Sequence, residues 1–207
     1  MINLENNSIS LDLFHCILKE IKNRPEHTVD IIDSFSKNQF KSKGKLLELI
    51  DKLNLNSDSE VVIFGCWYGS ILIPVLANKF KRITGIDLNS DVIGSARSNL
   101  FRNYKNVDFI VDNVFLRVME RYVTTNLVIN TSCEHMPSMK EWPWWDSIND
   151  GYFAFQSNNM FGIDGHTNCV NSIDEFKEQL PSTFQVLFED ELEDDRGARY
   201  TLVGKII

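Results

Sequence analysis

The stretch EVVIFGCWYGSILIPVLANKFKRITGID, residues Glu60 to Asp87, decides the fold that this sequence predicts. The apolar run Val61 to Phe64 predicts a buried strand, Ser70 to Phe80 predicts a helix, and Arg82 to Ile86 predicts a second strand. A strand, a helix and a second strand in this order form a βαβ unit, which implies a parallel sheet. Ligands of such sheets bind at the carboxyl ends of the strands, so we expect the functional site there.

Two features of the stretch lie at that edge. A turn bounded by Gly65 and Gly69 follows the first strand, and glycine lets the backbone approach a ligand closely because it has no Cβ. Asp87 ends the second strand, where a carboxylate can accept hydrogen bonds from two ribose hydroxyls. The turn and the carboxylate together describe a pocket for a nucleoside-containing cofactor.

The composition predicts a soluble globular protein. The chain has 207 residues, of which 43% are hydrophobic and 24% charged, enough for one substantial core with additions. The net charge is −8 and no long run of Lys or Arg occurs, so nucleic acid is disfavoured as a substrate because an acidic surface repels phosphate backbones. The nearest approach to a basic patch is interpreted as a solvated helix face; its members are Lys37, Lys41, Lys43 and Lys45.

Nothing in the sequence predicts membrane association. The opening residues, MINLENNSIS, are polar and lack the basic segment and apolar run of a signal peptide. No apolar segment approaches the roughly 20 residues that a membrane helix needs. The 4 cysteines are scattered without a C-x-x-C pair, which favours free thiols. We therefore expect a cytoplasmic protein.

Residues 1–55 predict a helical N-terminal extension. Ser10 is the expected N-cap of its first helix, and Pro25 ends that helix. The apolar stripe predicted for this helix consists of Leu11, Phe14, Ile17, Leu18 and Ile21. Two further helical patterns follow, and we expect residues 1–55 to act as a lid on a cofactor-binding domain formed by residues 56–207.

Beyond Asp87 the strand and helix patterns alternate again. The remaining expected strands are Val107 to Val111, Leu127 to Thr131, Tyr152 to Gln156, Phe184 to Phe188 and Arg199 to Ile206. The expected helices are Ser90 to Asn103, a segment carrying Val114, Leu116, Val118, Met119 and Tyr122, and Ser172 to Leu180, which opens with a capping box. An acidic turn, EDELEDDRG, joins the last two strands into a hairpin. The prediction is an α/β, Rossmann-like sheet of seven strands, mostly parallel, with an antiparallel last strand.

The order and spacing of these motifs resemble the class I S-adenosylmethionine-dependent methyltransferases. Gly65 and Gly69 match the first and third glycines of that family's loop, and Asp87 matches its ribose-binding acid. Asp112 matches the residue beside adenine, and NTSCEHMP, residues 130–137, resembles the segment after the fourth strand in the small-molecule branch. The resemblance implies S-adenosyl-L-methionine as the cofactor, bound by Gly65, Cys66, Trp67, Gly69, Asp87, Leu88, Asp112, Asn113, Val114 and Asn130.

Two positions depart from the family pattern. Trp67 stands where the middle glycine is expected, and Ile63 stands where an acidic residue of the first strand is expected. An indole at this turn either stacks on the ligand or walls it off, and a degenerate pocket is the alternative.

The candidate catalytic residues follow the fourth and fifth strands. Glu134 and His135 lie where a methyl acceptor would meet the cofactor, and a base there can take the acceptor's proton. The alternative is that Glu134 caps the next segment while His135 packs. His166, in the loop MFGIDGHTN, is a further candidate base, or a loop histidine with a structural hydrogen bond. A zinc set is disfavoured by its ligand spacing, so no metal is expected; its members would be Cys133, His135, His166 and Cys169.

The segment between the fourth and fifth strands is rich in tryptophan. Trp142, Trp144 and Trp145 either wall the substrate pocket or form a core wedge against the N-terminal helices, and we favour the wedge. Three asparagines can bind a polar substrate or satisfy loop backbone groups: Asn130, Asn158 and Asn159.

The function predicted from these residues is methyl transfer from S-adenosylmethionine to a small polar molecule. Residues 130–133 lack the Asn/Asp-Pro-Pro-aromatic motif of enzymes that methylate amino groups of nucleic acids, while protein substrates stay open. Two alternatives remain. One is a different reaction of the same cofactor, either aminopropyl transfer or cofactor cleavage; the other is a non-catalytic cofactor-binding module.

Overall fold

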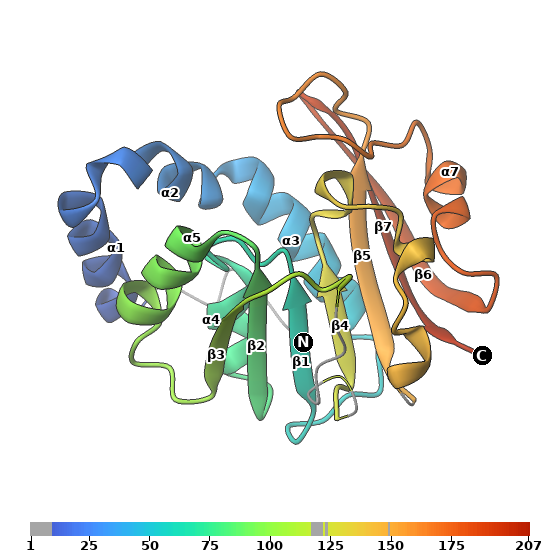
Figure 1. The fold of residues 1–207 in the computed structure, drawn as a ribbon, viewed down its shortest axis with the longest axis horizontal. Coiled ribbons are helices and arrows are strands. Elements are labelled where there is room, and N and C mark those ends of the chain that lie inside the picture. The colour runs from blue at the N-terminus through green and yellow to red at the C-terminus, as the bar shows by residue number, and fades with distance from the viewer. Residues whose placement is uncertain (1–9, 117–121, 123, 149) are drawn as a thin grey trace.

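The fold is a single mixed sheet flanked by helices (Figure 1). The computed structural model describes residues 10–116, 122, 124–148 and 150–207. Within them the strands are β1 Glu60–Phe64, β2 Arg82–Asp87, β3 Val107–Val111, β4 Leu127–Asn130, β5 Tyr152–Asn158, β6 Phe184–Asp194 and β7 Gly197–Ile206. They form a 7-stranded sheet in the order β3-β2-β1-β4-β5-β7-β6, in which β7 pairs antiparallel with both β5 and β6 while the other neighbouring strands pair parallel. The predicted sheet, including its antiparallel last strand, is confirmed.

The strand order reverses beside β1. Phe64 pairs with Ile86 of β2 on one side and with Asn130 of β4 on the other. The chain segments that follow these three strands therefore leave the sheet at the same edge, next to each other. An edge of this kind, at a topological switch point, is where open α/β sheets bind ligands.

The terminal hairpin is longer than predicted. The acidic residues 189–194 belong to β6 and pair with β7, and Arg196 N donates to Asp194 Oδ1 over 2.8 Å in the short turn that remains. β6 is an edge strand whose residues alternate between half-buried and exposed. Its carboxylates thus lie along an open edge, where like charge opposes pairing with another sheet.

The helices cover both faces of the sheet. Their bounds are α1 Leu11–Asn23, η2 Pro25–His27, α2 Thr28–Ser34, α3 Lys37–Ile50, α4 Leu72–Ala77, α5 Ser90–Ser95, η3 Ala96–Leu100, η4 Cys133–His135, η5 Met139–Glu141, η6 Trp145–Ser147 and α7 Ile173–Glu178. Ser10 caps α1 as predicted, since its Oγ accepts from Leu13 N over 3.1 Å. In the helix predicted after β3, Val118 and Met119 lie outside the described residues.

The buried face of α1 differs from the predicted stripe. Leu11, Phe14 and Leu18 are 69%, 48% and 49% exposed. The buried residues are Leu13, Cys16, Ile17 and Glu20. The reason is the packing of α1 on η3, where Asn99 Nδ2 donates to Glu20 Oε2 over 2.5 Å. This polar contact with a distant segment lies on the same face of α1 as the buried apolar residues, a face that the predicted apolar stripe did not identify.

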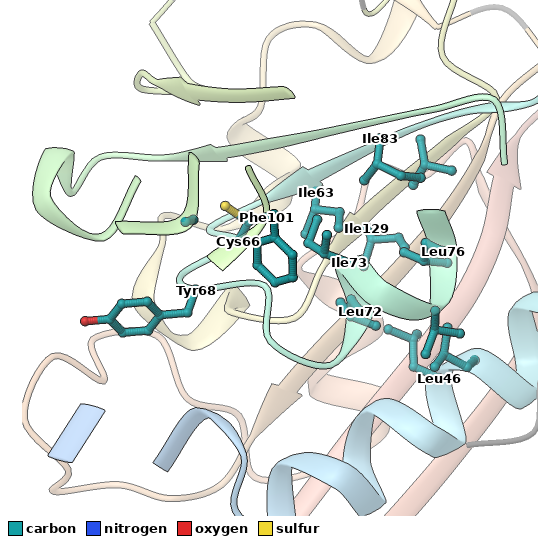
Figure 2. Close-up of a cluster of buried hydrophobic side chains, with 14 of the residues drawn as sticks. Leu46, Ile63, Cys66, Tyr68, Leu72, Ile73, Leu76, Ile83, Phe101 and Ile129 are labelled. Carbon is teal, nitrogen blue, oxygen red and sulfur yellow. The ribbon is translucent and has the colours of Figure 1, made fainter. Parts of the chain in front are cut away.

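Two apolar clusters fill the spaces on the two faces of the sheet. The first contains residues of α1, α3, α4 and η3, and Figure 2 shows Leu46, Leu72 and Leu76 among them. The second contains Trp142 and Trp145, whose Nε1 groups donate to the backbone oxygens of Val114 and Met139. The tryptophans are core residues as favoured, but the predicted wedge against the N-terminal helices is wrong, because those helices pack in the first cluster.

Two findings concern the cysteines and the helices of the described residues. All four cysteines, Cys16, Cys66, Cys133 and Cys169, are free thiols. Among the helices of the described segments, none combines the length and the apolar character needed to cross a membrane.

Candidate functional site

A cavity of about 720 Å³ lies at the carboxyl edge of the sheet, over the point where the strand order reverses. Its walls come from the segments after β1 to β5, from α2 and α3, and from the turn end of the β6–β7 hairpin. The predicted site residues that line it are Gly65, Cys66, Trp67, Gly69, Asp87, Leu88, Asp112, Asn113, Val114, Glu134, His135 and His166. The fold therefore brings nearly all the predicted residues to one cavity.

The glycine turn has left-handed backbone at every second residue. Gly65, Trp67 and Gly69 have φ of 54°, 48° and 66°. Trp67 thus adopts the conformation that glycine adopts without strain, which is the physical reason for a glycine at this position in the family pattern. Trp67 therefore differs from the family's glycine in its side chain, while its φ lies in the left-handed region that glycine also adopts.

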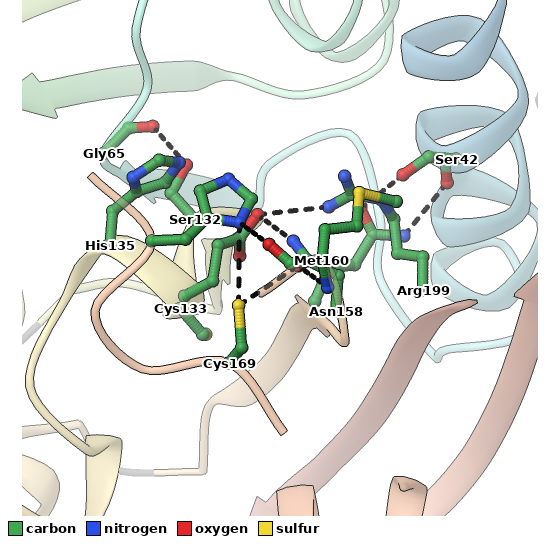
Figure 3. A network of polar contacts seen from close by, with 12 residues as sticks. Ser42, Gly65, Ser132, Cys133, His135, Asn158, Met160, Cys169 and Arg199 are labelled. Carbon is green, nitrogen blue, oxygen red and sulfur yellow. Dashed lines mark hydrogen bonds and ion pairs between the residues drawn. The ribbon is translucent and has the colours of Figure 1, made fainter. Parts of the chain in front are cut away.

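Neither glycine of the turn has room for a side chain. A Cβ on Gly65 would lie 2.5 Å from Met136 Cε, and a Cβ on Gly69 would lie 2.4 Å from Ile73 Cγ1. Ser132 Oγ also donates to the Gly65 backbone oxygen over 3.2 Å (Figure 3). The turn after β1 is therefore packed directly against the segment after β4.

The two strand-end carboxylates are half-buried and organise their own loops. Asp87 Oδ2 accepts from Trp67 N over 2.8 Å, and its Oδ1 accepts from Asn89 N over 3.0 Å. Asp112 Oδ1 accepts from Asn113 N over 2.8 Å, and Asp112 N donates to the Asp87 backbone oxygen over 3.1 Å. The ends of β2 and β3 are thus joined beside the cavity.

Asn130 is the one predicted cofactor-binding residue outside the cavity lining. Its side chain is fully buried, and its Nδ2 donates to Met136 Sδ and Met139 Sδ over 3.3 and 3.4 Å. Its Oδ1 accepts from Ser132 N over 2.9 Å. The buried Asn130 side chain therefore holds the loop after β4 through its contacts with Ser132, Met136 and Met139.

The three candidate catalytic residues form one group in the lining of the cavity. One ligand atom each from Glu134, His135 and His166 lies within 4.8 Å of the others. The two imidazole rings stand perpendicular with centroids 4.6 Å apart. Burial lowers the pKa of His166, so its ring is neutral at pH 7.

Glu134 is buried, and it is a partner of Asn158 and Arg199, which Figure 3 shows in a network of polar contacts. Its Oε1 accepts from Asn158 Nδ2 over 2.6 Å and from Arg199 Nη1 over 3.4 Å. Its Oε2 has no hydrogen-bond partner among the described residues. Asn158 thus positions the carboxylate, and its Oδ1 accepts from Met160 N.

The thiols considered as zinc ligands belong to different surroundings. Cys133 is buried with its Sγ donating to the Asn130 backbone oxygen over 3.6 Å, outside the Glu134–His135–His166 group. Cys169 Sγ lies 3.6 Å from His166 Nδ1, and burial raises the pKa of this thiol. The grouping that exists is two imidazoles and one carboxylate.

Lys43 of α3 is a cavity residue that the sequence interpretation missed. Lys37 and Lys41 are exposed as expected, whereas Lys43 is buried, and burial lowers its pKa to about 7. A signal was present in the sequence: Lys43 precedes Leu46, Leu47 and Ile50 by three, four and seven residues, which places it on the apolar face of its helix.

Contacts of η2 and α2 with the glycine turn and the residue after it were also missed. The Tyr68 hydroxyl and His27 Nδ1 are hydrogen-bonded over 2.8 Å, and the hydroxyls of Ser34 and Ser70 over 2.7 Å. Burial raises the pKa of Tyr68 to about 12, so the hydroxyl stays protonated. These pairs lie 41 and 36 residues apart, beyond any local sequence pattern.

Comparison with known proteins gives one local and several fold-wide similarities. No family model matches the chain. Ribosomal protein L11 methyltransferase of Shewanella baltica (strain OS195) is 42% identical over 57 residues, which are 28% of this chain and 19% of that protein. The corresponding protein of Shewanella denitrificans is 40% identical over the same length, so the chain matches only 19% of these relatives.

Solved methyltransferase structures resemble the whole sheet. The N-methyltransferase NodS from Bradyrhizobium japonicum WM9 is 14% identical with a TM-score of 0.62, covering 82% of this chain and 98% of its own. A SAM-dependent methyltransferase from Leishmania major is 14% identical with a TM-score of 0.67, covering 93% of this chain and 83% of its own. The chain therefore has the fold of the class I S-adenosylmethionine-dependent methyltransferases.

Proposed function

We propose that this protein transfers a methyl group from S-adenosylmethionine to a small polar molecule. The observation that carries the proposal is the single cavity that joins the glycine turn and Asp87 at one wall to Glu134, His135 and His166 at another. A volume of about 720 Å³ is within the range of pockets that hold a cofactor or drug-sized ligand.

The wall near β1 to β3 fits the nucleoside half of the cofactor. Asp87 accepts one backbone hydrogen bond on each oxygen, which leaves lone pairs for two ribose hydroxyls. Asp112, Asn113 and the buried Val114 supply polar and apolar surface for a base. S-adenosylmethionine supplies an electrophilic methyl group on a sulfonium. The chain's part is to hold that group in line with the acceptor and to exclude water.

The wall formed by the catalytic group fits proton removal. The Nδ1 atoms of His135 and His166 are hydrogen-bonded to the backbone oxygens of Gly165 and Met160, so each Nδ1 donates and Nε2 is the ring nitrogen that can accept a proton. An acceptor hydroxyl or ammonium would lose its proton to one of these bases as its oxygen or nitrogen bonds to the methyl carbon. The bonding pair of the broken S–C bond stays on sulfur, which becomes a neutral thioether.

The N-terminal helices contribute to the acceptor side. Asp30, Asp33 and Ser34 of α2 and Gln39 and Lys43 of α3 line the cavity. These contacts support the division into a helical lid, residues 1–55, and a cofactor-binding domain, residues 56–207. A lid that lines the cavity with polar residues favours a small polar acceptor over a large one.

A protein acceptor is the second candidate. It is favoured by the local similarity to the ribosomal protein L11 methyltransferase. Nucleic acid remains the disfavoured substrate because the net charge is −8, and a cytoplasmic location remains a prediction from the sequence.

The test is product analysis after incubation with S-adenosylmethionine. The purified protein would be supplied with pools of small hydroxy, amino and carboxylate compounds and, separately, with ribosomal proteins. Formation of S-adenosylhomocysteine that depends on one pool supports methyl transfer and identifies the acceptor class. Methylthioadenosine would indicate aminopropyl transfer or cofactor cleavage. An absence of binding in calorimetry at millimolar S-adenosylmethionine and S-adenosylhomocysteine would refute the proposal.

A further inference from the structure

The group formed by Glu134, His135 and His166 has the composition of a metal site. We propose that these three side chains bind one divalent first-row transition-metal ion, such as Zn²⁺, Co²⁺ or Fe²⁺, at the acceptor wall of the cavity. One ring nitrogen of each histidine and one carboxylate oxygen of Glu134 already lie within 4.8 Å of one another.

The hydrogen bonds made by Nδ1 of His135 and His166 leave Nε2 of each ring available to a metal ion. His135 Nδ1 lies 2.9 Å from the Gly165 backbone oxygen, and His166 Nδ1 lies 3.1 Å from the Met160 backbone oxygen. A carbonyl oxygen only accepts, so the proton is on Nδ1 and the lone pair of each neutral ring is on Nε2. Histidines that ligate metals are held in this way, with the second ring nitrogen donating to a backbone carbonyl or carboxylate.

Glu134 offers an oxygen that the protein leaves unsatisfied. Asn158 and Arg199 occupy Oε1, while Oε2 is buried without a hydrogen-bond partner among the described side chains and backbone groups. A buried carboxylate oxygen without a partner costs about 1 to 3 kcal/mol or more. A metal ion on Oε2 would remove that cost, and the partners of Oε1 fix the carboxylate's orientation, as supporting hydrogen bonds do in metal sites.

The present spacing requires a small adjustment. Atoms bound to one ion at about 2.1 Å lie at most about 4.2 Å apart. His135 is exposed, so its ring is free to move toward the other two ligands. Three protein ligands leave further coordination positions open toward the cavity, where an oxygen of the acceptor or a water can bind. In the metal-loaded site Nε2 of each histidine would hold the ion and would no longer be a base, so the ion would assist proton loss by acidifying the hydroxyl bound to it. Binding of the acceptor to the ion rests on the proposed function, whereas binding of the metal itself does not.

The ligand chemistry selects the metal class. Imidazole nitrogens suit Zn²⁺, Co²⁺, Fe²⁺ and Ni²⁺, while Mg²⁺ and Ca²⁺ prefer all-oxygen sites. Arg199 lies beside the carboxylate and Lys43 also lines the cavity, so the local positive charge weakens binding relative to a site without them. We therefore expect the protein to bind this metal ion reversibly, so that the bound ion exchanges with ions in solution.

The experiment uses the full chain without a polyhistidine tag, stripped with chelator and titrated with CoCl₂ and ZnCl₂. We expect about one equivalent of Co²⁺ to bind with visible absorption bands of an imidazole-ligated ion, and Zn²⁺ to displace it. His135→Ala and His166→Ala should each weaken Zn²⁺ binding at least about tenfold. His15→Ala, on the far helix α1, is the matched control and should change nothing.

Glu134→Gln is a second test, read together with thermal unfolding because Glu134 is buried beside Arg199. The two histidine variants keep the proposal falsifiable if that protein does not fold. Absence of Co²⁺ and Zn²⁺ binding at millimolar metal, or binding that survives both histidine substitutions, would overturn the proposal. Calorimetry with S-adenosylhomocysteine on the metal-free protein reads cofactor binding separately, so failure of the metal site is distinct from failure of the proposed function.

Discussion

The backbone N–H of Trp67 donates a 2.8 Å hydrogen bond to Oδ2 of Asp87. This bond ties the turn after β1 to the carboxylate that ends β2. It also fixes a tryptophan with a φ of 48° in a conformation that side-chain-bearing residues seldom adopt. Asp87 therefore shapes the turn and, in the proposed function, also binds the ribose.

Asp87→Ala should weaken S-adenosylhomocysteine binding at least about tenfold, since one charge-assisted contact is worth roughly 1.5 to 3 kcal/mol. The substitution removes both the ribose acceptor and the anchor of Trp67 N. Isothermal titration calorimetry measures the change.

Two controls separate these effects. Asp87→Asn keeps an oxygen acceptor for Trp67 N and loses the charge, so its affinity should lie between those of the wild type and Asp87→Ala. Asp58→Ala, in the exposed loop before β1, should bind normally. Equal affinity for Asp87→Ala and the wild type would remove the ribose from this position.

Trp67 should report cofactor binding by fluorescence. Its indole is half-buried and lines the cavity, whereas Trp142 and Trp145 are buried in the core. A ligand in the cavity should therefore quench Trp67. Trp67→Phe should lose most of the quenching while calorimetry still detects binding, and a full signal in that variant would place the ligand away from Trp67.

The parts of the site carried by local pattern were predictable. Gly65, Asp87 and Asp112 lie at or directly after the carboxyl ends of β1, β2 and β3. Parallel strands have their carboxyl ends at the same edge of the sheet, so these residues are predicted to lie near one another. Lys43 and the Tyr68–His27 pair were not predicted, because their positions depend on how α2 and α3 dock on that edge. Burial of Trp142 and Trp145 was predicted. The face of the sheet on which they pack was not, because it depends on tertiary contacts that hydrophobicity alone does not specify.

The Tyr68–His27 hydrogen bond should couple the N-terminal helices to the glycine turn. Tyr68 is fully buried, so losing its hydrogen-bond partner is costly. Tyr68→Phe and His27→Ala should each lower the free energy of unfolding by about 1 kcal/mol.

A double-mutant cycle by urea denaturation tests this coupling. The doubly substituted protein should lose less than the sum of the two single changes, with an interaction energy of about 0.5 to 1 kcal/mol. Strict additivity would show that the pair does not couple the two segments.

Substitution of the catalytic group should separate turnover from cofactor binding. His135→Ala and His166→Ala remove candidate bases that lie on a different wall from Asp87. We expect methyl transfer to slow by about 10²-fold or more, with the affinity for S-adenosylhomocysteine unchanged. Unchanged turnover in both variants would exclude the two histidines from proton transfer. The measurement requires the acceptor found by the product analysis proposed above.

Lys43 should make stability depend on pH. Burial lowers its pKa from 10.5 to about 7, so between these values the unfolded chain binds a proton that the native protein does not. The free energy of unfolding therefore rises with pH above about 7, by up to about 1.4 kcal/mol per pH unit from this group. Lys43→Met should remove this rise and be more stable at pH 7 by about 1 to 4 kcal/mol, because a buried ammonium no longer has to be desolvated.

The measurement is urea denaturation of both proteins from about pH 6 to 8.5, taken as the difference between them. The upper limit matters because burial raises the pKa values of Cys66 and Cys133, and these thiols lower stability once the unfolded chain begins to ionise near pH 9.0. Lys45→Met, on the exposed side of the same helix pairing with Glu48, is the matched control and should keep the wild-type slope in this range. A parallel pH dependence for Lys43→Met and the wild type would mean that Lys43 is protonated in the native cavity, and its ammonium would then be a fixed positive charge facing the acceptor.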